Sequence, residues 1–146
     1  MTGQFLKFIH LTDAHLVPHP QTLFGINVHE NLERAVDSIN HKFNDAEFCM
    51  ITGDLAHWGD AQAYSELTEI LNKLSMPYHL MIGNHDARRI AKDSLPTLPW
   101  SQEGFLNYRV KTTIGDFIVL DTVNDGKNNG RLCEIRLRWL RQQLLE

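Results

Sequence analysis

The chain has few cysteines, no long apolar run and no concentration of charge of one sign. Its two cysteines, Cys49 and Cys133, stand far apart and match no CxxC metal or redox spacing. No stretch approaches the ~20 consecutive apolar residues that a membrane span needs. The N-terminus lacks the basic segment and long apolar segment of a signal peptide. We therefore expect a reduced, cytoplasmic protein with no membrane partner.

Basic charge is also sparse along the sequence. The 146 residues carry a net charge of −4, and Lys and Arg are not clustered as nucleic-acid partners require. The longest basic cluster, within 131–141, alternates Arg with Leu and Trp and indicates one face of a helix. These features argue against a nucleic-acid polymer as partner. Because no repeat, low-complexity tract or linker occurs, one domain over residues 1–146 is the simplest interpretation.

Short apolar runs alternate with segments of helical period, which predicts a layered α/β fold. The expected strands are 5–12, 47–52, 78–82, 105–112 and 115–121, the last two joined as a hairpin. The expected helices are 30–43, a segment that begins after Asp60, and 131–145. In the last helix one side carries the apolar residues Leu132, Ile135, Trp139, Leu140 and Leu144.

Side chains that can bind metal ions follow each of the first three expected strands. Asp13 and His15 follow the first strand, and residues two apart in an extended segment point to the same side. Asp54 follows the second strand, and its two oxygens can bridge two ions. After the third strand, Asn84 offers a carbonyl oxygen while His85 stays free for proton chemistry. Each cluster alone is also typical of a turn, but three at successive strand ends indicate a site.

The motifs Asp13-x-His15, Gly53-Asp54 and Gly83-Asn84-His85-Asp86 resemble the first three signatures of the calcineurin-like metallophosphoesterases. More narrowly, the chain is similar to bacterial class III cyclic nucleotide phosphodiesterases and related glycerophosphodiesterases. The supporting segments are Leu23-Phe24-Gly25-Ile26-Asn27-Val28, Gly53-Asp54-Leu55 with Tyr64 beyond it, Leu120-Asp121-Thr122, Gly130-Arg131-Leu132 and Trp139-Leu140. The resemblance covers essentially the whole chain and implies the αββα metallophosphoesterase sandwich.

The resemblance also implies a role for each motif residue. Asp13 and His15 would bind the first metal ion, and Asp54 would bridge both ions. Asn84 would bind the second ion, while His85 would be the unligated histidine beside the leaving group. In this family the ions are metals such as Mn, Fe, Zn or Co, which suit a mixed oxygen and nitrogen ligand set. A hydroxide bridging the two ions would then hydrolyse a small phosphodiester, either a cyclic nucleotide or a glycerophosphodiester.

The sequence departs from the family pattern in two places. Many relatives carry Asp, which orients the free histidine, where this chain has His57, so a supporting and a surface role stay open. No histidine follows His85, so three ligands of the family's C-terminal histidine motifs are absent. We therefore expect a truncated domain that binds at most one divalent ion well and is weakly active or inactive by itself.

Two alternative functions remain open at this stage. One is a phosphomonoesterase of the same superfamily, and the other is a catalytically silent scaffold that binds other proteins. Arg88 and Arg89 could contact a phosphate, but we interpret them as surface residues that open a short helix. With part of the sandwich absent, exposed sheet edges and the apolar side of the last helix favour homo-oligomers or aggregation.

Overall fold

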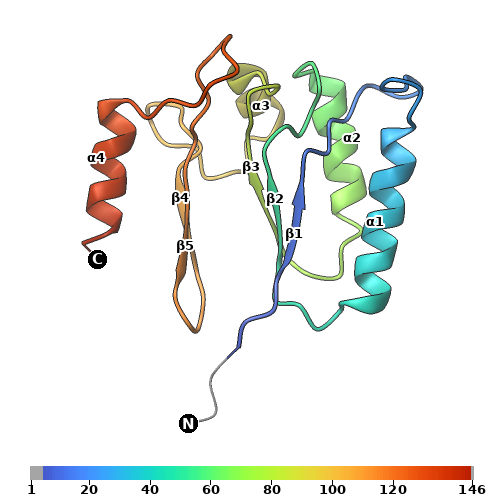
Figure 1. The fold of residues 1–146 in the computed structure, drawn as a ribbon, viewed down its shortest axis with the longest axis horizontal. Helices are drawn as coiled ribbons and strands as arrows, with labels where there is room; N and C mark the ends of the chain where they lie inside the picture. The colour runs from blue at the N-terminus through green and yellow to red at the C-terminus, as the bar shows by residue number, and fades with distance from the viewer. Residues whose placement is uncertain (1–4, 146) are drawn as a thin grey trace.

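The computed structural model describes residues 5–145, and strands alternate with helices along its first half (Figure 1). The strands are β1 (Ile9–Thr12), β2 (Cys49–Thr52), β3 (Tyr78–Met81), β4 (Tyr108–Lys111) and β5 (Asp116–Val119). The helices are α1 (Val28–Lys42), α2 (Ala61–Leu71), α3 (Arg88–Ser94) and α4 (Glu134–Gln143). The predicted α/β class is confirmed. Within residues 5–145, no helix has the length and apolar character needed to cross a membrane.

Strands β1, β2 and β3 form a parallel sheet in that order, with α1 and α2 as the crossover connections. The pairing places the last residues of the strands, Thr12, Thr52 and Met81, level with one another. Both helices lie on the same side of this sheet in Figure 1. The loops that follow the three strands therefore begin at one edge of the sheet.

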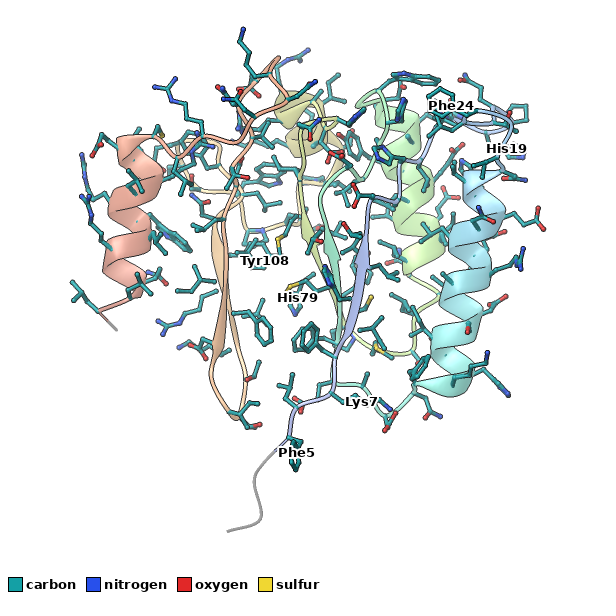
Figure 2. All side chains as sticks on the ribbon, in the orientation of Figure 1. Phe5, Lys7, His19, Phe24, His79 and Tyr108 are labelled. Atoms are coloured by element: carbon teal, nitrogen blue, oxygen red, sulfur yellow. The ribbon has the colours of Figure 1, made fainter. Side chains whose placement is uncertain are left out.

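The two faces of the parallel sheet pack against different partners. On β2, Cys49 and Ile51 join the core beneath α1 and α2, whereas Met50 faces the other way and packs with Val110 and Val119. Those two residues belong to the antiparallel β4–β5 hairpin, the second sheet. Figure 2 shows His79 and Tyr108 between the two sheets. With α4 outside the hairpin, the layers run helix, sheet, sheet, helix, as the family resemblance implied.

Helix α4 is attached through a charged residue and not through its apolar stripe. Ile135 is 46% exposed and Leu144 68% exposed, while the buried residue of the helix is Arg136. The Arg136 guanidinium donates to the backbone carbonyls of Asp121 and Val123 at 2.8 and 3.0 Å. The exposure of Ile135 and Leu144 agrees with the expectation that the apolar side of the last helix lacks cover. Helical period shows which residues share a face, but it does not show whether another element covers that face.

Candidate metal centre

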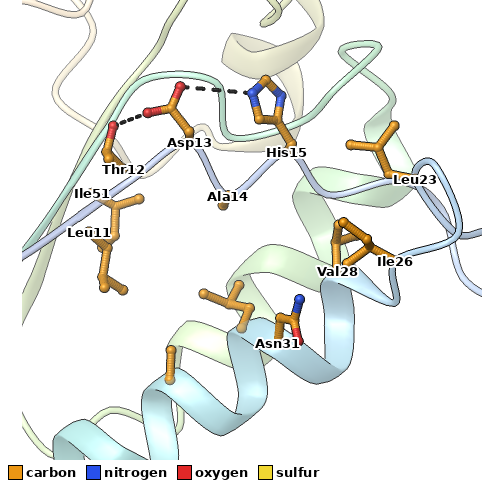
Figure 3. A pocket seen from close by; sticks show the side chains of 12 residues that line it. Leu11, Thr12, Asp13, Ala14, His15, Leu23, Ile26, Val28, Asn31 and Ile51 are labelled. Carbon is orange, nitrogen blue, oxygen red and sulfur yellow. Dashed lines mark hydrogen bonds and ion pairs between the residues drawn. The ribbon is translucent and has the colours of Figure 1, made fainter.

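The first two predicted ligands leave β1 through left-handed backbone conformations. Asp13 has a φ of 56° and His15 a φ of 45°, a region that Asp and His adopt more readily than most residues. The expectation of an extended segment is wrong here, because β1 ends at Thr12. The side chains nevertheless converge, and Nε2 of His15 lies 3.8 Å from a carboxylate oxygen of Asp13 (Figure 3).

Asp54 reaches the same place from the loop after β2. Its φ of 48° follows a φ of 73° at Gly53, and its Oδ2 lies 3.7 Å from Nε2 of His15. The two loops stay hydrogen-bonded beyond the strand ends. The backbone N–H of His15 donates to the carbonyl of Asp54 at 2.8 Å, and that of Leu16 donates to Leu55 at 3.0 Å. This continued pairing sets the spacing between the histidine and the carboxylate.

The loop after β3 fits closely against Asp54. A Cβ atom on Gly83 would stand 2.2 Å from Oδ1 of Asp54, so only glycine fits there. The backbone N–H of His85 donates to the same oxygen at 3.0 Å. Asn84 lies between these two contacts, is exposed, and lines a small cavity of about 120 Å³ with Thr122 and Asn129. The structure thus brings the third motif to the predicted edge.

A buried carboxylate, Asp86, ties the second and third loops together. It accepts hydrogen bonds from the N–H groups of Leu55, Ala56 and Gly83 at 3.0, 3.0 and 2.7 Å. The hydroxyl of Tyr64 donates a fourth bond at 2.9 Å. Burial raises the pKa of the Asp86 carboxyl, and these four donors oppose the rise. Sequence reasoning assigned Asp86 no role, because a motif does not reveal which of its carboxylates turns inward.

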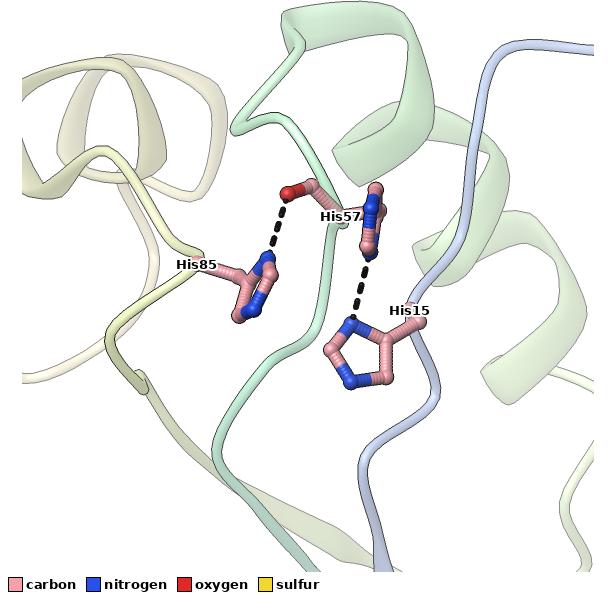
Figure 4. A group of neighbouring side chains, drawn as sticks. All are labelled: His15, His57 and His85. Atoms are coloured by element: carbon pink, nitrogen blue, oxygen red, sulfur yellow. Dashed lines mark hydrogen bonds between the residues drawn. The ribbon is translucent and has the colours of Figure 1, made fainter. Parts of the chain in front are cut away.

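Three histidines gather beside the carboxylates (Figure 4). The Nδ1 atoms of His57 and His15 lie 3.2 Å apart, and the His57 ring stacks on His85 with centroids 4.7 Å apart. Nδ1 of His85 donates to the backbone carbonyl of His57 at 2.9 Å, which leaves Nε2 of His85 as the available nitrogen. Burial, followed by the nearby imidazoles, lowers the pKa of His57. His57 therefore supports both neighbours, which decides between its two open roles.

The donor set fits a divalent metal ion. Asp13, His15 and Asp54 each offer one ligand atom, and these atoms all lie within 4.8 Å of one another. Ligands of a tetrahedral ion at ~2.1 Å stand about 3.4 Å apart. The observed separations of 3.7 and 3.8 Å need only a small contraction. Two carboxylates and one imidazole suit borderline metals such as Mn, Fe, Co and Zn.

The surroundings of the centre are apolar on one side and charged on another. A cavity of about 340 Å³ beside Asp13 and His15 is lined largely by apolar residues of β1, α1 and the loop between them (Figure 3). Beyond His85, Arg88 donates to both carboxylate oxygens of Asp121 at 2.8 and 3.0 Å. The surface interpretation of Arg88 is wrong, since its side chain is 13% exposed, whereas that of Arg89 is 85% exposed, as expected.

Comparisons with known proteins agree with this geometry. Residues 6–143 match the family model described as calcineurin-like phosphoesterase. A probable cyclic nucleotide phosphodiesterase (RPA0124) of Rhodopseudomonas palustris is 38% identical over 97% of this chain and 52% of the relative. A probable glycerophosphodiester phosphodiesterase, GpdQ, of Arcobacter nitrofigilis is 28% identical over 93% of this chain and 50% of the relative. The chain thus spans about half the length of these curated relatives.

The fold also has a counterpart among solved structures. The purple acid phosphatase PPD1 from yellow lupin seeds superimposes with a TM-score of 0.64 at 11% sequence identity. The match covers 97% of this chain and 28% of the plant protein. At this low identity the likeness concerns the fold alone, and it supports the layered α/β architecture inferred from the sequence.

Proposed function

Because the chain belongs to the calcineurin-like phosphoesterase family, we propose that its strand-end site hydrolyses a small phosphodiester with the help of divalent metal ions. The observation that carries the proposal is the convergence of Asp13, His15 and Asp54, whose ligand atoms lie within 4.8 Å of one another. Two relatives are named as a cyclic nucleotide and a glycerophosphodiester phosphodiesterase, so both names describe diesters. This agreement favours a diesterase over the phosphomonoesterase alternative.

The motif residues offer more ligands to one metal ion than to a second. Asp13, His15 and Asp54 supply three ligands to one ion, which we propose to be Mn, Fe, Zn or Co. A second ion would share Asp54 and gain only the neutral oxygen of Asn84. We therefore propose that the 146-residue chain holds one ion well and a second one weakly. When bound, such ions lower the pKa of water and offset the charge of the phosphate.

The histidines orient one metal ligand and supply a proton to the leaving group. His57 orients His15 through the contact between their Nδ1 atoms, which leaves Nε2 of His15 directed at the carboxylates. The carbonyl of His57 fixes Nδ1 of His85, so that Nε2 of His85 can give a proton to the leaving oxygen. General acids of this kind contribute roughly 10²- to 10⁴-fold to a rate. The silent-scaffold alternative gives no reason for such an arrangement.

Metal titration tests the proposal without relying on turnover. The wild-type chain should bind one equivalent of Mn²⁺ tightly in calorimetry, and Asp54→Asn should weaken this binding by at least ~10-fold. Asp37→Asn, on the exposed side of α1, is the matched control and should bind like wild type. Equal affinities of the Asp54 and Asp37 variants would refute the proposed ligand set.

A chromogenic diester assay tests the catalytic part. Hydrolysis of bis(p-nitrophenyl) phosphate with Mn²⁺, Co²⁺ or Zn²⁺ should be weak for the 146-residue chain. It should rise when a C-terminal segment that supplies further histidine ligands is attached, and His85→Ala should then lower it by roughly 10²- to 10⁴-fold. Faster hydrolysis of p-nitrophenyl phosphate than of the diester would favour the monoesterase alternative. Strong turnover by the short chain that Asp54→Asn abolishes would mean that a partner subunit completes the site.

A further inference from the structure

The turn between β1 and α1 presents an aromatic ring to solvent. Leu23 and Ile26 exchange both backbone hydrogen bonds, at 2.9 and 2.8 Å, which closes a two-residue turn. The residues within it, Phe24 and Gly25, have φ values of 50° and 80°. Turns of this kind favour Asn-Gly, because Asn tolerates a positive φ. Here a phenylalanine occupies the asparagine position, and it is 87% exposed.

The conformation of Phe24 matches that of the metal ligands. Among residues 5–145, the non-glycine residues with positive φ are Asp13, His15, Phe24 and Asp54. A bulky residue in this region is a true outlier, and such outliers gather where the backbone serves function. The segment before the turn is also anchored. Nε2 of His29 donates to the carbonyl of Val17 at 2.7 Å, and the N–H of His19 donates to Glu66 at 3.1 Å.

The exposed ring lies next to the metal centre. The centroids of Phe24 and His57 are 5.9 Å apart, and His57 contacts both His15 and His85. Trp58 is 56% exposed, and its ring centroid lies 5.1 Å from that of His57, also in an edge-on geometry. Figure 2 shows Phe24 near His19 at the end of the molecule where the site loops gather. Two exposed aromatic rings therefore flank the histidine that supports the site.

We propose that Phe24 and Trp58 form a stacking subsite for a planar aromatic group of the diester, namely a nucleobase. This inference rests on the proposed function and narrows its substrate class. Nucleobases stack on aromatic side chains through their flat faces, and removal of one such ring weakens binding by roughly 5- to 150-fold. A glycerol group has no flat face to stack, so the subsite favours cyclic nucleotides over glycerophosphodiesters.

Equilibrium binding separates this inference from the catalytic proposal. The Mn²⁺-loaded chain is titrated with 3′,5′-cyclic AMP and with glycerophosphoethanolamine, in wild type and in the variants Phe24→Ala and Trp58→Ala. Each variant should lose roughly 5- to 150-fold in affinity for the nucleotide and keep its affinity for the glycerol diester. Phe24→Tyr should retain nucleotide binding. Phe43→Ala, which alters another exposed phenylalanine at the end of α1, is the control.

Thermal stability distinguishes a binding role of Phe24 from a purely structural one. Phe24→Asn relieves the left-handed conformation, so it should raise the thermal midpoint by roughly 2–4 °C while it weakens nucleotide binding. Wild type that binds the glycerol diester as well as the nucleotide, or variants that bind the nucleotide like Phe43→Ala, would overturn the stacking subsite. Ring-dependent nucleotide binding without diester hydrolysis by the C-terminally extended chain would instead refute the catalytic proposal and leave the subsite standing.

Discussion

The parallel sheet with α1 and α2 is held by apolar packing, whereas residues 105–145 combine an apolar face on the β4–β5 hairpin with a buried ionic cluster around Asp121. Helix α2 buries a stripe that includes Leu67 and Leu71, while α4 buries Arg136. The metal centre stands on the apolar region, so its geometry depends on that core. The second region reaches the site through Asp121, whose carboxylate binds Arg88 directly after the third motif. This ionic cluster connects the start of the segment after β5 and α4 to the loop that carries His85.

The largest expected effect comes from breaking this ionic cluster. Asp121→Asn leaves the guanidinium groups of Arg88 and Arg136 without their buried counter-charge and should cost about 3–5 kcal/mol in free energy of unfolding. The matched control, Asp125→Asn, alters a carboxylate that is 69% exposed and should cost less than ~1 kcal/mol. Urea unfolding measures both. Equal losses would show that the buried cluster does not join the two regions.

Shortening apolar side chains tests how strongly α2 and α4 each depend on apolar packing. Leu67→Ala in α2 should lower the free energy of unfolding by ~2–5 kcal/mol, because it opens a cavity in the closed core. Leu144→Ala, beyond the end of α4, should stay within about 0.5 kcal/mol, because its side chain is 68% exposed. If the second change proved as costly as the first, the apolar side of α4 would have to be covered in solution.

Tyr64→Phe tests whether the apolar core is coupled to the site loops. Burial raises the pKa of the Tyr64 hydroxyl, so it stays a donor to Asp86 over the usable pH range. Its removal should cost ~1–3 kcal/mol and weaken Mn²⁺ binding less than Asp54→Asn does. Tyr78→Phe removes a hydroxyl bond to exposed Asn72 and serves as the control. Calorimetric unfolding with and without Mn²⁺ distinguishes the two tyrosines.

Association should follow from the uncovered side of α4. Ile135, Leu144 and Leu145 are 46%, 68% and 89% exposed, and such patches favour contact between copies of the chain. Light scattering should show mass rising with concentration, and the double variant Ile135→Gln/Leu144→Gln should shift the chain toward monomer. Phe43→Gln, in the other region, should leave the association unchanged. A wild-type chain that stays monomeric at every concentration and melts cooperatively would contradict this.

The smallest expected effect is a difference in thiol reactivity. Burial raises the pKa of Cys49 to about 11, while the backbone N–H of Arg136 lowers the pKa of Cys133 before α4. At pH 8 a thiol reagent should therefore label Cys133 rapidly and Cys49 only after unfolding. The variant Cys133→Ser should leave the native chain almost unlabelled. Rapid labelling of Cys49 would mean that the sheet region opens more easily than its packing indicates.

Much of the site could be predicted because its residues directly follow short apolar runs, and such runs identify strands from neighbouring residues alone. Strands β2 and β3 lie within the predicted ranges, and the motifs begin one or two residues after the strand ends. Helical crossovers give parallel neighbouring strands, so the candidate ligands at the three strand ends were expected at one edge, namely Asp13, His15, Asp54 and Asn84. The stated reason for the convergence of Asp13 and His15 was wrong, however. Their left-handed backbone lies where His15 is hydrogen-bonded to the second loop, a contact that a local pattern does not contain.

The sequence by itself determined the fold class, the order of the strands and the identity of the candidate ligands, because period and chemistry are properties of neighbouring residues. Only the tertiary structure decided that Asp86 turns inward, that His57 supports two other histidines and that Arg88 and Arg136 share Asp121. Each of these contacts joins residues far apart in the chain. Their formation depends on which side chains the packed layers exclude from water, since a buried polar group must find its partner there.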